Sequence, residues 1–308
     1  MLSETHNCNR TNGFFSILLL SLLLLSCNDM GTNESEPTPF PWPNAALNDI
    51  FGISPNNIFI AGDQGVILYY NGNEWDLHET PTSQNIHGVW ALEPHRVYAV
   101  GNEGTILLYN GNVWEEMQSP VTDDIHDIWG TAGDNIFATT AVGDILLFDG
   151  SSWSAVDKPD TGQLNALWGL SENEVYATGS DGIILKYDGS SWRTVWDGPS
   201  PMYGIWGESN ENIFAVGADG QIVHFDGEEW SPMISVTPNT LYDVWGVYNN
   251  VIYAVGFNGT LLISDGVDWE QYPIELLENF YGIWGTGDFG FIVVGTNGRV
   301  FHNTSFGL

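Results

Sequence analysis

Seven polar side chains recur along this sequence at intervals of 38 or 39 residues, and their types suit the binding of a polar ligand. Each can donate or accept hydrogen bonds, and the tyrosines and histidines add an aromatic face. Such a mixture can stack on a sugar or grip a polar peptide. These residues, called the mouth ring below, are Asn48, His87, His126, Asn165, Tyr203, Tyr242 and Tyr281.

The residue that follows each mouth-ring position is small or acidic, and the acidic ones are Asp49, Asp127 and Asp243. A pair of carboxylates can act as acid and base in glycoside cleavage at a suitable separation, which a sequence does not give. Alternatively, these groups satisfy strand ends beside water. A binding site, a polysaccharide-active hydrolase or lyase and a purely structural surface protein are therefore all open readings, and we favour binding.

The two histidines of the mouth ring, with Asp49 and Asp127, offer metal-ligating atoms. They lack the short ligand spacing of a dedicated metal site. We expect no cofactor and no metal, with calcium as a weak alternative.

Motifs of known catalytic centres are missing from the sequence. It has no G-x-S-x-G, no H-E-x-x-H and no spaced cysteine set. Residues 285–290 match G-x-G-x-x-G, but they fall between two expected strands with no helix after them. Resemblance to sialidases would imply three converging arginines, whereas Arg96, Arg193 and Arg299 occupy different offsets in the repeat described next. We therefore expect no enzymatic activity.

The mouth ring belongs to a repeat of about 39 residues that occurs seven times. The fifth copy contains apolar segments at residues 203–206, 212–216 and 221–225, and a fourth from Trp230. Glycine, aspartate and asparagine separate these segments where tight turns need positive φ. A fixed period of this size, with four short strands in each unit, is typical of β-propeller blades. The sequence predicts an all-β, seven-bladed β-propeller over residues 42–308.

Twelve of the 14 tryptophans occupy two positions of the repeat, so we expect them to pack between blades and not to bind a ligand. The seventh copy, residues 280–303, has no fourth strand led by tryptophan. We predict that a strand near Trp42 supplies it and closes the ring, which would remove exposed sheet edges.

Two parts of each predicted blade lie on the same face of the propeller: the start of the first strand and the turn between the second and third strands. The mouth ring is therefore predicted to surround one mouth of the central channel, with the neighbouring aspartates and the turns beside it. The turns contribute Asp63, Glu103, Asp181, Asp219, Asn258 and Asn297.

The N-terminal segment has the pattern of an export signal. Residues 14–25 are apolar apart from two serines, a length that suits a signal peptide better than a membrane span. The following Leu24-Leu25-Ser26-Cys27 resembles the lipobox of bacterial lipoproteins, which implies cleavage before Cys27 and lipidation of that residue. We predict a signal peptide at residues 1–26 and a lipidated cysteine with a flexible tether at 27–41, and we place the protein in the bacterial cell envelope, in the periplasm or on the outer surface.

The charge of the chain narrows its partners. It contains 39 acidic and 6 basic residues, and the net charge of −33 is unchanged by removal of the signal, which holds one acid, Glu4, and one base, Arg10. Such a surface repels nucleic acid and anionic headgroups. We expect a monomeric propeller that binds a glycan or a protein, binds no nucleic acid and contacts the membrane only through its N-terminal lipid.

The repeat resembles the bacterial propellers with BNR-like repeats that are related to the photosystem II assembly-factor family. The shared features are the Trp-Gly strand, the Ile-Phe-Ala-Val-Gly strand, the Gly-x-x-Gly-x-Ile turn and Asp-Gly-x-x-Trp. The last of these replaces the full Asp-box. The resemblance implies a scaffold for protein or glycan contacts and transfers no catalytic residue.

Overall fold

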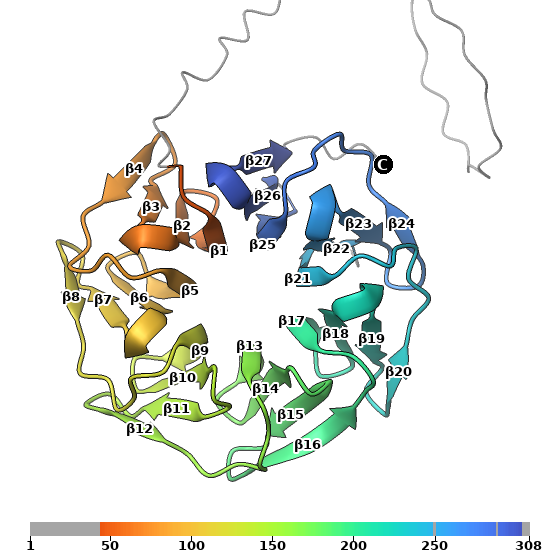
Figure 1. Cartoon of the computed structure of the whole chain (residues 1–308), viewed down its shortest axis with the longest axis horizontal. Coiled ribbons are helices and arrows are strands. Elements are labelled where there is room, and N and C mark those ends of the chain that lie inside the picture. The colour runs from red at the N-terminus through yellow and green to blue at the C-terminus, as the bar shows by residue number, and fades with distance from the viewer. Residues whose placement is uncertain (1–43, 249–250, 288, 304–308) are drawn as a thin grey trace, which may run out of the picture. The chain divides into compact units, whose positions relative to one another are not determined.

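The computed structural model describes residues 44–248, 251–287 and 289–303. Their strands form seven antiparallel sheets, six with four strands and one with three, and each sheet follows the order of the chain. The sheets are arranged as blades around a central axis, with blade 1 formed by β1–β4 and blade 7 by β25–β27 (Figure 1). The predicted seven-bladed β-propeller is thus confirmed.

The first strand of each blade lies nearest the axis (Figure 1). These strands are β1 (Leu47–Ser54), β5 (Ile86–Glu93), β9 (Ile125–Ala132), β13 (Leu164–Ser171), β17 (Met202–Ser209), β21 (Leu241–Tyr248) and β25 (Phe280–Thr286). The second strands are β2 (Asn57–Gly62), β6 (Arg96–Gly101), β10 (Asn135–Thr140), β14 (Glu174–Gly179), β18 (Asn212–Gly217), β22 (Val251–Gly256) and β26 (Gly290–Gly295).

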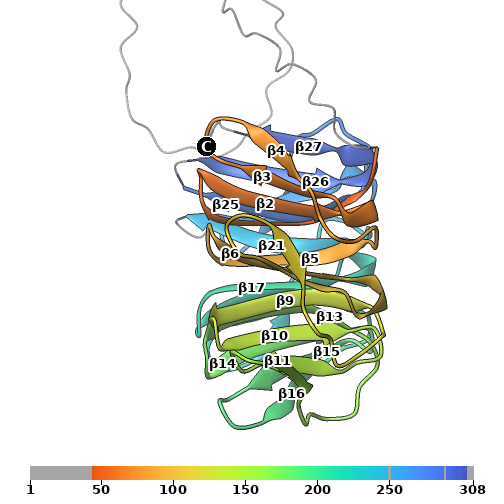
Figure 2. The same ribbon diagram turned by 90° about the vertical axis from the view of Figure 1, so that its left-hand side faces the viewer.

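The third and fourth strands lie farther out, and Figure 2 shows the blades edge-on. The third strands are β3 (Ile67–Tyr70), β7 (Ile106–Tyr109), β11 (Ile145–Phe148), β15 (Ile183–Tyr187), β19 (Ile222–Phe225), β23 (Leu261–Ser264) and β27 (Val300–Asn303). The fourth strands are β4 (Trp75–His78), β8 (Trp114–Glu116), β12 (Trp153–Ala155), β16 (Trp192–Asp197), β20 (Trp230–Pro232) and β24 (Trp269–Gln271).

The tryptophans of the first strands, called the inner tryptophans, hold neighbouring blades together, as predicted. A Cβ placed on Gly246 of blade 6 would lie 2.0 Å from the Cη2 atom of Trp206 in blade 5, so the indole occupies the space that the glycine leaves. Trp284 packs in the same way over Gly52 and thereby joins blade 7 to blade 1. Elsewhere the indole N–H of Trp168 donates to the carbonyl oxygen of Gly207 in the next blade, at 3.1 Å.

The tryptophans of the fourth strands, called the outer tryptophans, contact aromatic rings of their own blades, and several also pack against the preceding blade as predicted, such as Trp192 against Phe137 at 5.7 Å. Each begins a fourth strand, and in five blades its ring lies 5.1 to 5.4 Å from an aromatic ring at the end of the third strand, as for Tyr109 and Trp114. Such pairs bury large apolar areas and fix the register of the outer two strands.

The first strands are longer than predicted. The segment 203–206 was expected to end at Gly207, but β17 runs from Met202 to Ser209. Gly207 lies within the strand: it pairs with Ile213 of β18, and its carbonyl oxygen accepts a hydrogen bond from the Trp168 indole of the preceding blade.

Three predictions concern residues outside the described part of the chain: the signal peptide at residues 1–26, the tether from Cys27 to residue 41, and ring closure by Trp42. They stay predictions. Among the described residues, blade 7 has three strands. No helix in the described part of the chain is long and apolar enough to cross a membrane.

Replacing Gly246 by alanine is expected to destabilise the propeller by about 2 kcal/mol or more, because the added methyl overlaps the Trp206 indole and the core must shift. Denaturant unfolding would measure the loss. Gly133→Ala is the control, since its methyl would meet only the guanidinium end of Arg96, which can swing away. Equal losses in the two variants would contradict this account of blade packing.

Ring closure can be tested by comparing a chain that begins at Asn44 with one that begins at Asn28. If a strand near Trp42 completes blade 7, the shorter chain should melt at a lower temperature and aggregate more readily, because an edge of blade 7 is exposed. Equal melting temperatures would show that the strand near Trp42 does not stabilise the ring.

Candidate functional site

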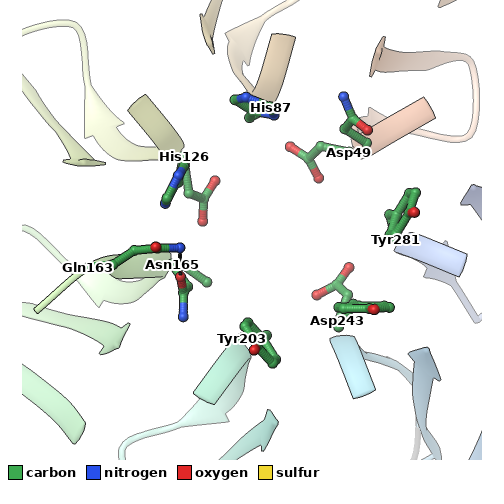
Figure 3. A pocket seen from close by; sticks show the side chains of 12 residues that line it. Asp49, His87, His126, Gln163, Asn165, Tyr203, Asp243 and Tyr281 are labelled. Carbon is green, nitrogen blue, oxygen red and sulfur yellow. Dashed lines mark hydrogen bonds between the residues drawn. The ribbon is translucent and has the colours of Figure 1, made fainter. Parts of the chain in front are cut away.

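A cavity of about 330 Å³ opens at one mouth of the channel, and all ten predicted ligand-binding residues line it. Figure 3 shows the carboxylates of Asp49 and Asp243 directed toward the open centre, with His87 and His126 on one side and Tyr203 and Tyr281 on another. Every mouth-ring side chain is half-buried. The complete set is Asn48, Asp49, His87, His126, Asp127, Asn165, Tyr203, Tyr242, Asp243 and Tyr281.

A β-bulge near the start of each first strand positions the mouth ring. In β17, Met202 pairs with Gly217 and Gly204 with Val216, so Tyr203 between them has no partner on β18. The same irregularity falls at the mouth-ring residue of all seven blades. A bulge redirects a side chain that regular alternation would place elsewhere. It therefore directs seven different side chains into one cavity without disturbing the rest of the blade.

The predicted turn residues are not among those that line the cavity. Glu103, Asp219, Asn258 and Asn297 occupy the left-handed region, with φ between 55° and 59°. The turns there need such a conformation, which asparagine and aspartate tolerate better than most residues. The backbone thus explains the residue types of Asp219, Asn258 and Asn297. Asp63 and Asp181 instead accept hydrogen bonds, from Asn48 Nδ2 at 2.9 Å and from the Gly162 N–H at 2.8 Å.

In blades 1, 3 and 4 the mouth-ring side chain makes a hydrogen bond to a backbone carbonyl of the next blade. Asn48 donates from Nδ2 to the carbonyl oxygen of Ile86 at 2.9 Å, and Asn165 donates to that of Met202 at 2.7 Å. His126 bonds through Nδ1 to the carbonyl oxygen of Leu164 at 2.8 Å, which makes Nδ1 the protonated nitrogen. These three residues hold blade to blade as well as lining the cavity.

The two histidines lie next to each other, with ring centroids 6.0 Å apart. His87 contacts the side-chain oxygen of Asn102 through Nε2. Burial lowers the pKa of His126, and the neighbouring His87 lowers it further, against opposing effects of the Leu164 carbonyl and Asp124. His126 is therefore neutral near pH 7.

Blades 5, 6 and 7 contribute a continuous aromatic surface, called the tyrosine arc below, formed by Tyr203, Tyr242 and Tyr281. The rings of Tyr203 and Tyr242 are 5.8 Å apart and inclined by 54°, and those of Tyr242 and Tyr281 are 5.3 Å apart and inclined by 62°. None of the three hydroxyls makes a hydrogen bond within the described residues. Burial raises the pKa of Tyr242, with a further contribution from its two neighbours, so its hydroxyl stays protonated.

The three aspartates join pairs of blades. Asp243 accepts one hydrogen bond from the backbone N–H of Val244 at 2.8 Å and another, through its second oxygen, from Ile283 in blade 7 at 2.9 Å. Asp49 makes the equivalent bonds to Ile50 and to Val89 in blade 2. Asp127 does the same between blades 3 and 4, with Ile128 and Leu167.

Desolvation raises the pKa of each of these carboxyl groups, and the backbone hydrogen bonds oppose it only in part. The pKa of Asp49 is raised to about 6 and that of Asp243 to about 7. Asp127 is also raised well above its ordinary pKa, with repulsion from Asp49 and Asp243 adding to burial. All three carboxyls therefore lose their protons at a higher pH than most aspartates do.

The aspartates also mark a boundary in the channel. A second, smaller cavity of about 70 Å³ shares them and is otherwise lined by apolar and aromatic side chains, including Ile50, Val244 and Trp245.

Among the described residues, no group of three or more histidine, cysteine, aspartate or glutamate side chains is arranged to hold a metal ion.

Two further residues line the cavity. Ala166 is one of the small residues that follow the mouth-ring positions, whereas Gln163 was not predicted. Gln163 donates from Nε2 to the side-chain oxygen of Asn165 at 2.9 Å. The corresponding positions of blades 2 and 7 hold Asn85 and Asn279, which accept hydrogen bonds from turn backbones. Gln163 could have been noticed in the sequence because its side chain is longer than those of the residues that cap the turn at this position in other blades.

Several solved β-propellers resemble this chain. The structure of YCF48 bound to D1 peptide matches with a TM-score of 0.70 at 17% identity, covering 85% of this chain and 94% of that one. YCF48 from Cyanidioschyzon merolae matches with a TM-score of 0.70 at 18% identity, over 86% of this chain and 97% of that one. The extracellular domain of BT4673 from B. thetaiotaomicron matches with a TM-score of 0.68 at 14% identity, over 85% of this chain but 38% of that one.

These similarities show a shared propeller fold. YCF48 is a photosystem II assembly factor, so the resemblance predicted from the repeat is confirmed at the level of fold. No family model matches the chain, and no curated protein matches its sequence.

The raised pKa values predict that the propeller becomes more stable as the pH falls from 7.5 to 5.5. The folded state binds protons more tightly than the unfolded chain, in which these carboxyls titrate near 3.8, so stability is lost as the pH rises through about 6 and 7. Thermal unfolding should show a higher melting temperature at pH 5.5.

Two variants identify the groups responsible. Asp243→Asn should reduce the difference between the two pH values. Asp188→Asn should leave it unchanged, because backbone and serine donors lower the pKa of Asp188 to about 2, outside this range. An undiminished difference in Asp243→Asn would assign the effect to the general negative charge of the surface.

Proposed function

We propose that this protein is a binding propeller that holds a polar partner at the mouth of its channel, with the tyrosine arc as the main contact surface. The observation that carries the proposal is the difference between the two sides of the mouth. Asn48, His126 and Asn165 already bond to neighbouring blades. The hydroxyls of the tyrosine arc make no such bonds within the described residues, so they can bond a ligand while the rings supply contact area.

A protein partner is supported by the structural comparisons. One similar propeller is known bound to a peptide, and WD40 propellers such as that of Doa1 share the fold, with a TM-score of 0.72 at 11% identity. Fold similarity alone does not transfer a function. A surface glycan is the second ligand class for which tyrosine, asparagine and aspartate side chains are suited.

The proposed role is a non-enzymatic one. Each oxygen of Asp49, Asp127 and Asp243 accepts a backbone hydrogen bond. That arrangement supports a role for the three carboxylates in joining blades.

We place the protein outside the cytoplasm, anchored through a lipid on Cys27 with a tether up to residue 41. The basis is the lipobox-like sequence that ends at Cys27. The similarity to an extracellular propeller domain agrees with this placement. The mouth would then face partners in the cell envelope.

The proposal is tested by probing the purified protein on a glycan array and on an array of peptides, beside the double variant Tyr203→Ala/Tyr242→Ala. We expect at least one ligand class to bind, and the double variant to lose about tenfold or more in affinity, because it removes two of the three stacking rings. The control Tyr69→Ala removes a half-buried tyrosine of blade 1 that does not line the cavity. Binding that survives the double variant would place the site elsewhere.

A further inference from the structure

The lining of the mouth cavity limits the charge of what it can hold. No lysine or arginine is among the described residues that line it. The cations of the described chain lie elsewhere, and two of them are already paired, Lys186 with Glu174 and Arg299 with Glu278. A carboxylate or phosphate group entering the cavity would meet no counter-charge and would approach three aspartates. Anionic ligands are therefore disfavoured.

The tyrosine arc offers ring surface to a cation. Its three rings are mutually inclined and not coplanar, so they do not form the single flat platform that a sugar ring stacks on. Inclined aromatic rings around a common space attract ammonium and guanidinium groups through their quadrupoles. Arginine and lysine also carry apolar stems that can lie along the rings while the charged head continues inward.

The three aspartates lie where such a head would arrive. Each carboxylate oxygen accepts one backbone hydrogen bond and keeps capacity for a second. Burial raises the pKa of all three carboxyls, and a cation bound beside them would lower these pKa values again and favour the ionised form. Beyond the aspartates the channel is lined by apolar side chains, so a charged head would stop at this level.

We infer that the ligand at the mouth is a polypeptide segment that inserts a lysine or arginine side chain past the tyrosine arc toward Asp49, Asp127 and Asp243. This inference rests on the proposed function and specifies its ligand. The partner is then a basic protein segment, which also complements the net charge of −33.

The experiment uses fluorescent nine-residue peptides of glycine and serine that differ only at the central residue. Lysine is compared with ε-acetyl-lysine, and arginine with citrulline, so that charge changes while length and shape are nearly kept. Titrations with the purified full chain in 150 mM salt, followed by fluorescence anisotropy, should show the charged peptides binding about tenfold more tightly than their neutral counterparts.

Three variants locate the effect. Tyr242→Ala should remove most of the preference for charge, whereas Tyr242→Phe, which keeps the ring and loses only the hydroxyl, should retain it. Glu228→Gln/Glu229→Gln removes two exposed charges between β19 and β20, away from the cavity, and should change nothing. Melting temperatures of all variants would show that each is folded.

The outcomes separate this inference from the proposed function. Equal binding of charged and neutral peptides, no binding of either, or a preference that falls only in the Glu228/Glu229 variant would overturn the inference. Loss of glycan or neutral-peptide binding in Tyr203→Ala/Tyr242→Ala, without any preference for charge, would overturn the inference but leave the proposed function standing. Tyrosine-independent binding of every probe would overturn both.

Discussion

Contact between the indole of one blade and a glycine of the next joins six of the seven pairs of neighbouring blades, and Phe51 and Ala91 take these places between blades 1 and 2. The tryptophan of each Trp-Gly strand fills the space above the glycine of the next blade, as Trp206 does over Gly246, or donates its N–H to that glycine's carbonyl, as Trp168 does to Gly207. A blade on its own has two apolar faces and cannot bury either. Because the same contact joins blade 7 to blade 1 through Trp284 and Gly52, the stack closes on itself. The geometry of the mouth is then set by the whole ring and not by any one blade.

The β-bulge in each first strand separates the function of the mouth from the packing of the blade. Regular strands alternate their side chains, so a residue that faced the channel would ordinarily constrain its neighbours. The unpaired residue escapes this constraint, and it is the position that varies between asparagine, histidine and tyrosine. The next residue returns to regular pairing and carries the carboxylate or the small side chain. One ring of positions is thus variable and the adjacent ring is structural.

The sequence predicted the number of blades, the strand order and the convergence of the mouth ring, because each follows from a period that repeats along the chain. It did not predict how the polar groups are used. Whether Asn165 faces a ligand or the Met202 carbonyl depends on the distance between two blades, which no single repeat encodes. The joining role of Asp243 was missed for the same reason, since its second partner, Ile283, is 40 residues away. The end of the first strand was misplaced because a glycine needed for packing looks like a glycine needed for a turn.

The aspartate level of the channel has a property that comes from the number of blades. Where one blade carries an aspartate at this level, the equivalent residue of the blade before it is a glycine. The pairs in neighbouring blades are Gly88 and Asp127, Gly204 and Asp243, and Gly282 and Asp49. A Cβ on Gly204 would lie 2.8 Å from the Cα of Asp243, and one on Gly88 would lie 3.0 Å from the Cα of Asp127, so a side chain at either position would crowd the neighbouring aspartate. Aspartate and a small residue can alternate strictly only around a ring with an even number of blades. Around seven blades, this pattern has room for three aspartates. The pattern must break once, and it does so between Ala166 and Gly204. A pattern that alternates around seven blades therefore has no rotational symmetry, and it gives this level of the channel a fixed orientation.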